Sequence, residues 1–299
     1  MNFFELGNVM TFGTFIQPDH SLVDAEDPAK ALNIPIYSGF HGLDDAHRFY
    51  GQSDVFDAIL ARSAVLDLNY EDQCSSQYYF DLVRTLEELR GEYHRVVEVG
   101  VFMGGSSNIF TGCMTPLGFD LDMVDINAPY LRFAYERMRR TYPEEAKRIR
   151  LFHGDLPSYV RAVMDENDKS NFIVHHDGSH SFEQVVRDMG ALSFIKNRLC
   201  AVIAQDTHLR GRPDHMNFVD MAMYAVFGLD LQYVPIGAAY TSIDPRTWPN
   251  EYQGNYFMAD AREGFVIPMD LNDFRYPHIG LSIDDFVPPL PAAMDSRAA

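Results

Sequence analysis

Short apolar runs alternate with helical stretches over the middle of the chain, and this alternation is the feature that most constrains the fold. It extends from about residue 77 to about residue 237. Strands that alternate with helices in this way indicate a parallel sheet with helices on both faces, and therefore an α/β fold. The expected strands are Arg95–Val99, Phe119–Ile126, Ile149–His153, Phe172–Asp177, Leu199–Ala204 and one around Leu231–Pro235; the expected helices are Tyr78–Leu89, one from near Gly105, Tyr130–Tyr142, Leu156–Met164, Phe182–Phe194 and Asn217–Phe227.

The two ends of the chain differ from this middle part. Residues 1–75 carry scattered Gly, Pro and aromatic residues with weak periodicity. Residues 241–299 are rich in Pro, with a strand expected somewhere in Gly254–Met269. Both ends contain too many apolar residues for plain linkers. We therefore predict an N-terminal cap, lid or oligomerisation segment over 1–75, a core over 76–270, and a C-terminal extension or arm over 271–299.

The composition limits the partners of the chain. Its 24 Lys and Arg against 43 Asp and Glu give 299 residues a net charge of −19, which disfavours nucleic acid, anionic membranes and polyanionic substrates. A small neutral or basic partner is compatible with this charge, and the long flanking segments with a homo-oligomer. Three distant Cys residues, no secretory pattern at the N-terminus and no apolar run of about 18 residues favour a cytoplasmic protein without a membrane span.

A glycine motif follows the first strand of the alternating region. Glu98, Gly100 and Gly104 form the pattern Glu-x-Gly-x-x-x-Gly, which continues into a helical stretch. A strand, a tight loop and a helix N-terminus suit a nucleotide-like ligand. The pattern lacks the Gly-x-Gly of a dinucleotide site and the Lys-Ser/Thr of a P-loop. We therefore expect a ligand that is neither a pyrophosphate dinucleotide nor a triphosphate.

Almost every core strand ends in an acid or a polar cluster. The acids are Glu98, Asp125, Asp155, Asp177 and Asp206. Because ligands of open α/β sheets lie beyond the carboxyl ends of the strands, these acids suggest one shared crevice. Each one alone could instead be a turn residue or a helix cap.

Two of these acids are placed to bind a nucleoside. Asp125, one strand after the glycine loop, could accept hydrogen bonds from a ribose diol. Asp155, after the third strand, could accept one from an adenine amino group. The alternative for Asp155 is a cap of the helix that follows it.

The fourth and fifth strands end in groups suited to acid–base chemistry. Asp177 is followed by a glycine and then by His180, whose imidazole could act as a general base. Asp206 would lie beside Asp177, and a Mg²⁺ between the two carboxylates would relieve their repulsion and orient substrate hydroxyls. The alternatives are a histidine that caps or packs at a helix start and two separately solvated turn acids.

Taken together, these motifs resemble a known superfamily. The segment Val-Glu-Val-Gly-x-x-x-Gly, Asp125, Gly154-Asp155, Asp177-Gly178-Ser179-His180 and Asp206-Thr207 is similar to class I S-adenosylmethionine-dependent methyltransferases. Within that superfamily it most resembles the metal-dependent O-methyltransferases of the macrocin and mycinamicin type and the cephalosporin-hydroxylase-like proteins. The resemblance covers about residues 77–237.

The resemblance implies a fold, a cofactor and an activity. The fold would be a Rossmann-like, seven-stranded, mostly parallel sheet whose last strand is antiparallel. The activity would be O-methylation of a small-molecule hydroxyl in natural-product or sugar tailoring, with S-adenosylmethionine and Mg²⁺ as cofactors. The implied cofactor-binding residues are Glu98, Gly100, Gly104, Ser106, Asp125 and Asp155, with His180 and Asp177 as catalytic residues and Asp177, Asp206 and Gln205 as metal ligands.

One residue departs from the family pattern. Many of these enzymes have a further acid where this chain has Gln205, so the metal site would carry one negative charge less, and we expect a lower Mg²⁺ affinity. Aromatic residues of the N-terminal segment, Tyr37, Phe40 and Tyr50, are candidates for the acceptor pocket.

Other functions remain open. An oxidative enzyme of the cephalosporin-hydroxylase-like branch would need a two-histidine, one-carboxylate iron site, for which His180, His208 and either Asp177 or Asp206 are available. A Rossmann-like binding or partner subunit without catalysis is the non-enzymatic alternative. The glycine spacing disfavours a nicotinamide dehydrogenase.

Overall fold

An eight-stranded sheet forms the centre of the molecule. The computed structural model describes residues 11–18, 20–35, 43–68, 70, 74–164, 166, 170–211, 217–239, 251–252, 255–258 and 260–287. The strand order is β1-β4-β3-β2-β5-β6-β11-β8. The bounds are β1 Thr14–Ile16, β2 Arg95–Val99, β3 Asp120–Asp125, β4 Ile149–His153, β5 Phe172–His176, β6 Leu199–Gln205, β8 Val234–Ala239 and β11 Arg262–Pro268.

The directions of the strands define a doubly wound sheet. Strands β4, β3, β2, β5 and β6 run parallel, and the order reverses between β2 and β5. Strand β11 is antiparallel to both β6 and β8, as expected for the last strand. The sheet has eight strands instead of the seven that the resemblance implies, because β1 pairs antiparallel with β4. Residues 14–16 of the expected N-terminal cap thus belong to the main sheet.

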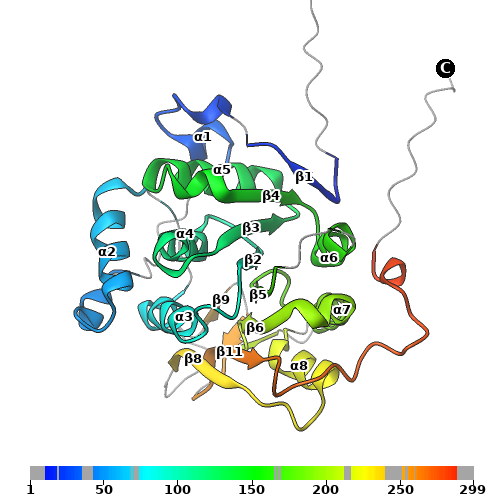
Figure 1. Ribbon diagram of the computed structural model, residues 1–299. Coiled ribbons are helices and arrows are strands. Elements are labelled where there is room, and N and C mark those ends of the chain that lie inside the picture. Colours follow the sequence, from blue (N-terminus) through cyan, green and yellow to red (C-terminus); the bar gives the residue numbers. More distant parts are fainter. Residues whose placement is uncertain are drawn as a thin grey trace, which may run out of the picture.

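Helices cover both faces of this sheet (Figure 1). On one face lie α2 Asp54–Leu66, α3 Ser76–Glu88, α4 Gly105–Leu117 and α5 Ala128–Thr141; on the other lie α6 Leu156–Met164, α7 Phe182–Leu192 and α8 Val219–Phe227. The sequence sets where several of them begin. Ser53 and Ser75 accept hydrogen bonds from the third backbone N–H of α2 and α3, and Asn127 does the same for α5.

The core consists of two apolar layers separated by the sheet. Val96 and Leu121 pack against α3, α4 and α5, whereas Val97 and Val124 pack against α6, α7 and α8. All five residues of β2 and of β5 are buried. This explains why neither strand alternates apolar and polar residues, although Arg95 and Glu98 interrupt β2 and two histidines end β5. In the described part of the chain, no helix combines the length and the apolar character that a membrane crossing requires.

Smaller elements complete the fold. A second sheet contains β7 Leu209–Arg210, β10 Asn255–Phe257 and β9 Glu251–Tyr252, in that order. Short helices are α1 Pro28–Ala31, η1 His20–Leu22, η2 Ala46–Phe49, η3 Glu145–Arg148, η4 Ser193–Arg198 and η5 Ile283–Asp285. The last described residues, up to 287, pack on α7 and α8: Arg187 donates to the carbonyl of Phe286, and the amide of Arg275 to that of Val226.

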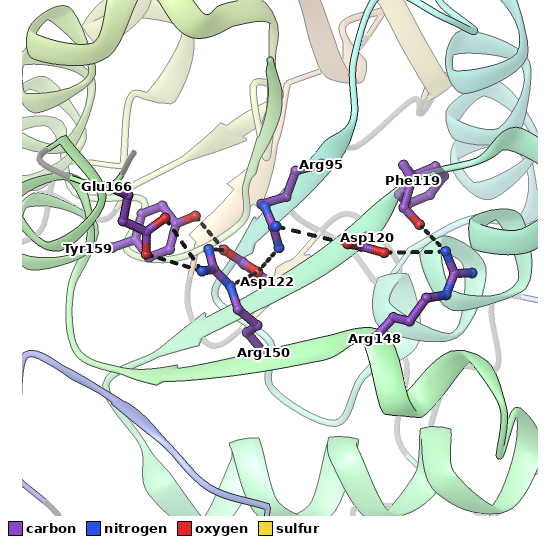
Figure 2. Close-up of polar contacts among 8 residues, drawn as sticks. All are labelled: Arg95, Phe119, Asp120, Asp122, Arg148, Arg150, Tyr159 and Glu166. Atoms are coloured by element: carbon purple, nitrogen blue, oxygen red, sulfur yellow. Dashed lines mark hydrogen bonds and ion pairs between the residues drawn. The ribbon is translucent and has the colours of Figure 1, made fainter. Parts of the chain in front are cut away.

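A buried ionic network joins three strands to α6 at the amino ends of the strands (Figure 2). The fully buried Asp122 carboxylate of β3 accepts hydrogen bonds from Arg95 of β2 at 2.8 Å and from Arg150 of β4 at 2.9 and 2.5 Å. The Tyr159 hydroxyl of α6 donates to it at 2.6 Å. Asp122 is thus fully paired, as a carboxylate buried in a sheet must be. This network lies at the end of the sheet opposite the strand-end acids.

Candidate functional site

A large cavity lies at the carboxyl ends of the parallel strands. Its volume is about 1160 Å³, and its wall includes the residues that follow β2, β3, β4, β5 and β6. The order of the sheet reverses between β2 and β5, so the loops after these two strands diverge and leave a crevice. The expectation that the strand ends share one crevice is therefore confirmed for Asp125, Asp155, Asp177 and Asp206, which all line the cavity.

The glycine loop after β2 forms one wall of this cavity. Gly100 has φ +84°, and a Cβ atom there would lie 2.1 Å from the carbonyl oxygen of Asp177. Only glycine fits this close approach between the loops after β2 and β5. Gly104, with φ +76°, precedes α4, and a Cβ atom there would lie 2.9 Å from Cβ of Ala134. Gly100 lines the cavity, whereas Gly104 fixes the packing of α4 against α5.

Asp125 holds the glycine loop in place. Its Oδ2 accepts hydrogen bonds from the backbone N–H groups of Val101 at 2.8 Å and Phe102 at 3.2 Å, and its Oδ1 accepts one from Asn127 at 2.7 Å. Phe102 has φ +46°, an uncommon conformation for a bulky residue, which the bond to Asp125 helps to maintain. The two loop amides that could face an anion are thus already occupied by a carboxylate. Burial raises the pKa of Asp125.

Glu98 and Ser106 lie at different depths. Glu98 is only 1% exposed, and it lies beneath the loop, not on the cavity wall. Its Oε2 accepts a hydrogen bond of 2.5 Å from the hydroxyl of Ser107, and burial raises its pKa to about 8. Ser106, at the start of α4, is on the wall. Glu98 therefore supports the start of α4 through Ser107, whereas Ser106 can contact a ligand in the cavity.

Asp155 caps a helix and also lines the cavity. Its Oδ1 accepts a hydrogen bond from the backbone N–H of Ser158 at 3.0 Å, so it caps α6 as the alternative interpretation held. It also lines the cavity, with Oδ2 4.0 Å from Nη2 of Arg187. One carboxylate oxygen thus serves the helix, and the other is near the cavity.

The fourth and fifth strands bring together the residues expected to carry the chemistry. Asp177 follows β5 and is anchored by its backbone N–H, which donates to the carbonyl of Val99 at 2.8 Å. His180 lies three residues later, with Nε2 3.3 Å from Oδ2 of Asp206 after β6. Asp206 has φ +60°, a conformation that Asp tolerates better than most residues. All three line the cavity, and His180 and Asp206 form an imidazole–carboxylate pair there.

The expected metal ligands Asp177, Gln205 and Asp206 all line the cavity, where Gln205 and Asp206 contact protein groups. Gln205 directs its amide nitrogen to Sγ of Cys74 at 3.1 Å, and Asp206 faces His180. Within the described ranges, no group of three or more His, Cys, Asp or Glu side chains is arranged to hold a metal ion. The same finding counts against the iron site, for which His208 is also unsuited: it is buried away from the cavity wall, and burial lowers its pKa to about 4.

The structure adds residues that the sequence did not single out. Phe12, Ile126 and His153 line the cavity near Asp155, and Asp188 of α7 lines it with its Oδ2 2.9 Å from Nε2 of His176. Position at the end of a core strand is the available signal for Ile126 and His153, whereas Phe12 has no local signal. Among the aromatic candidates, Tyr50 is 63% exposed and does not line the cavity, and Tyr37 and Phe40 lie outside the described residues.

The cavity is strongly acidic. Five carboxylates line it, namely Asp125, Asp155, Asp177, Asp188 and Asp206, and none of the lining residues, all of which are described, is Lys or Arg. Its imidazole groups belong to His153 and His180. Such a wall attracts cations and repels phosphates and carboxylates, since it offers anions no charged partner.

Comparisons with known proteins find similarity in structure and none in sequence. No family model matches the chain, and no curated protein matches it significantly. An O-methyltransferase from Bacillus cereus in complex with SAH is 11% identical over 76% of this chain and 94% of its own, with a TM-score of 0.44. Cofactor-bound Rv0187 from MTB is 12% identical over 77% of this chain and 98% of its own, also with a TM-score of 0.44. Likeness of this degree does not establish a family.

Proposed function

We propose that this chain is an S-adenosylmethionine-dependent methyltransferase that methylates a hydroxyl group of a small molecule. The observation that carries the proposal is the position of Asp125 between the glycine loop and the cavity. Its carboxylate accepts hydrogen bonds from the backbone amides of Val101 and Phe102 and also lines the cavity. A nucleoside cofactor can then meet an acceptor for its ribose hydroxyls, while a phosphate would meet a negative charge.

The charge and size of the cavity support the same cofactor. S-adenosylmethionine carries a sulfonium group, an ammonium group and one carboxylate but no phosphate, and its net positive charge suits a wall with five carboxylates and no Lys or Arg. A volume of about 1160 Å³ exceeds the roughly 300–1,000 Å³ of common small-molecule sites. The excess leaves room for an acceptor beside the cofactor.

The His180–Asp206 pair supplies what the reaction requires from the protein. When bound, S-adenosylmethionine provides a methyl group whose bond to sulfur breaks as the bond to the acceptor oxygen forms. The acceptor hydroxyl must lose its proton. With the Nε2 proton of His180 directed at Asp206, Nδ1 is the nitrogen that accepts the hydroxyl proton, and the carboxylate stabilises the imidazolium that results. Asp177, beside His180 on the wall, helps to place the hydroxyl.

The acceptor is proposed to be uncharged or basic, as in the tailoring of sugars and other natural products. An anionic acceptor would find no Lys or Arg on the cavity wall to pair with. A hydroxyl next to an amine would find several carboxylates. This preference is a property of the wall itself and supports what the net charge of −19 suggests.

Calorimetric titration tests the cofactor. We expect S-adenosylmethionine and S-adenosylhomocysteine to bind with micromolar dissociation constants, and NAD⁺ and ATP not to bind. Asp125→Asn should weaken binding about tenfold or more, because it removes a charge-assisted hydrogen bond. Asp120→Asn, at the opposite end of the sheet, is the matched control and should leave the affinity unchanged. Absence of binding by the unaltered protein would refute the proposal.

Transfer of a tritiated methyl group to a panel of sugars, amino sugars and catechols tests the activity. His180→Ala should lower the transfer rate about 10²- to 10⁴-fold with the cofactor affinity retained. Metal removal with EDTA should leave the rate unchanged. Binding without transfer to any acceptor of the panel would instead favour the non-catalytic binding subunit.

A further inference from the structure

The first strand of the chain brings an aromatic residue to the cavity. Strand β1 runs antiparallel to β4, with Thr14 opposite His153. Because β1 is antiparallel, the residues just before it lie at the carboxyl end of β4. The backbone N–H of Gly13 continues the pairing by donating to the carbonyl of His153 at 2.7 Å. Phe12 therefore reaches the cavity wall from a segment more than 60 residues before the glycine loop.

Close packing of two glycines fixes this position. Gly13 has φ +79°, and a Cβ atom on Gly154 would lie 3.1 Å from Cα of Gly13 and 2.6 Å from the ring of Phe152. A larger residue at 154 would push the two backbones apart. The hydroxyl of Thr14 also donates to the carbonyl of Thr11 at 2.7 Å, which closes the turn around Phe12. The ring of Phe12 is thus held over the end of β4.

Phe12, His153 and Ile126 form one continuous face of the cavity. The rings of Phe12 and His153 lie 5.6 Å apart at 75°, an edge-to-face contact. Nε2 of His153 lies 3.2 Å from the carbonyl oxygen of Ile126, to which it donates. The side chain of Ile126 is 66% exposed although it is apolar and lines the cavity. An exposed apolar side chain beside two aromatic rings is suited to cover a flat, partly apolar group.

We infer that Phe12, His153 and Ile126 bind the adenine base of the cofactor, so that the N-terminal strand is part of the cofactor site. The inference rests on the proposed function. It assigns residues 11–16 to cofactor binding rather than to a lid over the acceptor or to an oligomer contact. The second oxygen of Asp155, near the same end of the cavity, is then positioned for the amino group of the base.

Titration of S-adenosylhomocysteine and of adenosine into the unaltered protein and three variants tests this inference. Phe12→Ala should raise the dissociation constants of both compounds about tenfold, since it removes one aromatic contact with the base. Phe12→Tyr should retain the affinity of the unaltered protein, because the ring is kept. Tyr50→Ala, which removes an exposed aromatic side chain away from the cavity, is the matched control and should have no effect.

The outcomes separate the two proposals. If the unaltered protein binds S-adenosylhomocysteine and Phe12→Ala binds it equally well, the role of Phe12 is refuted and the methyltransferase proposal stands. If the unaltered protein binds neither compound, both proposals fail. Equal melting temperatures of Phe12→Ala and Tyr50→Ala would establish that a loss of affinity does not arise from unfolding. Equal losses of affinity in both variants would also overturn the inference.

Discussion

Glu98 is a carboxyl group that the folded chain keeps away from water. It supports the start of α4 through Ser107 and makes no contact with the cavity. Its pKa of about 8 means that the neutral acid is the main form at neutral pH. Directly below its glycine loop, the protein thus has a carboxyl group that ionises just above neutral pH. Its described hydrogen bond is with a neutral hydroxyl group and not with a cation.

The stability of the protein should therefore depend on pH through Glu98. In the unfolded chain a Glu ionises near pH 4.3, so between about pH 4.3 and 8 the folded state binds one proton more than the unfolded state. Stability then falls as pH rises through this interval, by up to about 1.4 kcal/mol per pH unit, and levels off above pH 8. Glu98→Gln removes this titration while keeping the size of the side chain.

Urea denaturation of both proteins at pH 5.5, 6.5, 7.5 and 8.5 measures the effect. We expect the unaltered protein to lose stability relative to Glu98→Gln as pH rises. Burial also raises the pKa of Glu263, to about 7, but Glu263 is present in both proteins, so its contribution cancels in the difference. Parallel stability curves would show that Glu98 ionises normally in the folded protein.

At the scale of single residues, sequence predicted position better than role. The acids at the strand ends were expected in one crevice, and four of the five line the cavity. Their partners were not predictable, because these partners are remote in sequence. Asp125 binds an amide 24 positions away, and Gln205 binds Cys74 131 positions away. Such contacts depend on how loops of different strands meet.

Strands β2, β3 and β4 are joined to one another and to α6 by the single carboxylate of Asp122 (Figure 2). Removal of its charge should destabilise all of them together. Asp122→Asn removes the buried anion between Arg95 and Arg150, which keep only the more exposed Asp120 at 3.9 Å and Glu166 at 3.1 Å. Breaking a buried pair in this way costs about 3–5 kcal/mol. Asp120→Asn is the matched control. It lies two residues away on the same strand, its side chain is 41% exposed, and its loss should cost under about 1 kcal/mol.

Chemical denaturation with urea compares the two variants. The midpoint of unfolding should move far more for Asp122→Asn than for Asp120→Asn. The affinity of the folded protein for S-adenosylhomocysteine should stay the same in both, because the network lies at the end of the sheet opposite the cavity. Similar losses of stability in the two variants would contradict a structural role specific to Asp122.

Elements with a strong local pattern were predictable, and short ones were not. The expected bounds of β2 and β4 match the structure, and the helices differ by a few residues, because period and capping are local properties. The expected strand near Leu231 begins later, at Val234, since Leu231 is buried in the turn after α8. Strand β1 has three residues and pairs with a partner more than 130 residues away, so nothing local marks it.

The charge of the whole molecule acts in the same direction as the wall of the cavity. A net charge of −19 and five cavity carboxylates attract a cation from a distance. S-adenosylmethionine has a net charge of +1 at neutral pH, and S-adenosylhomocysteine, which has lost the sulfonium, is neutral overall. An increase in salt shortens the Debye length to a few ångströms and should weaken binding of the charged compound selectively.

Titrations in 0.05 M and 0.5 M NaCl test this electrostatic contribution. The dissociation constant of S-adenosylmethionine should rise several-fold over this range, whereas that of S-adenosylhomocysteine should change little. S-adenosylhomocysteine, the neutral product, is thus the control for effects of salt on the fold. An equal response of the two compounds would mean that the cavity does not discriminate by charge.

Strand β1 contributes to the cavity and also protects the edge of the sheet from aggregation. It and β8 are the two outermost strands of the sheet, and outermost strands offer unpaired backbone groups to other chains. Strand β1 presents three residues and β8 contains Pro235, which has no N–H to donate. Both borders are therefore poor templates for another strand. Without β1, the five residues of β4 would form the outermost strand, and their unpaired backbone groups could pair with another chain. Loss of the N-terminal strand would therefore remove the Phe12 ring from the cavity and also favour aggregation.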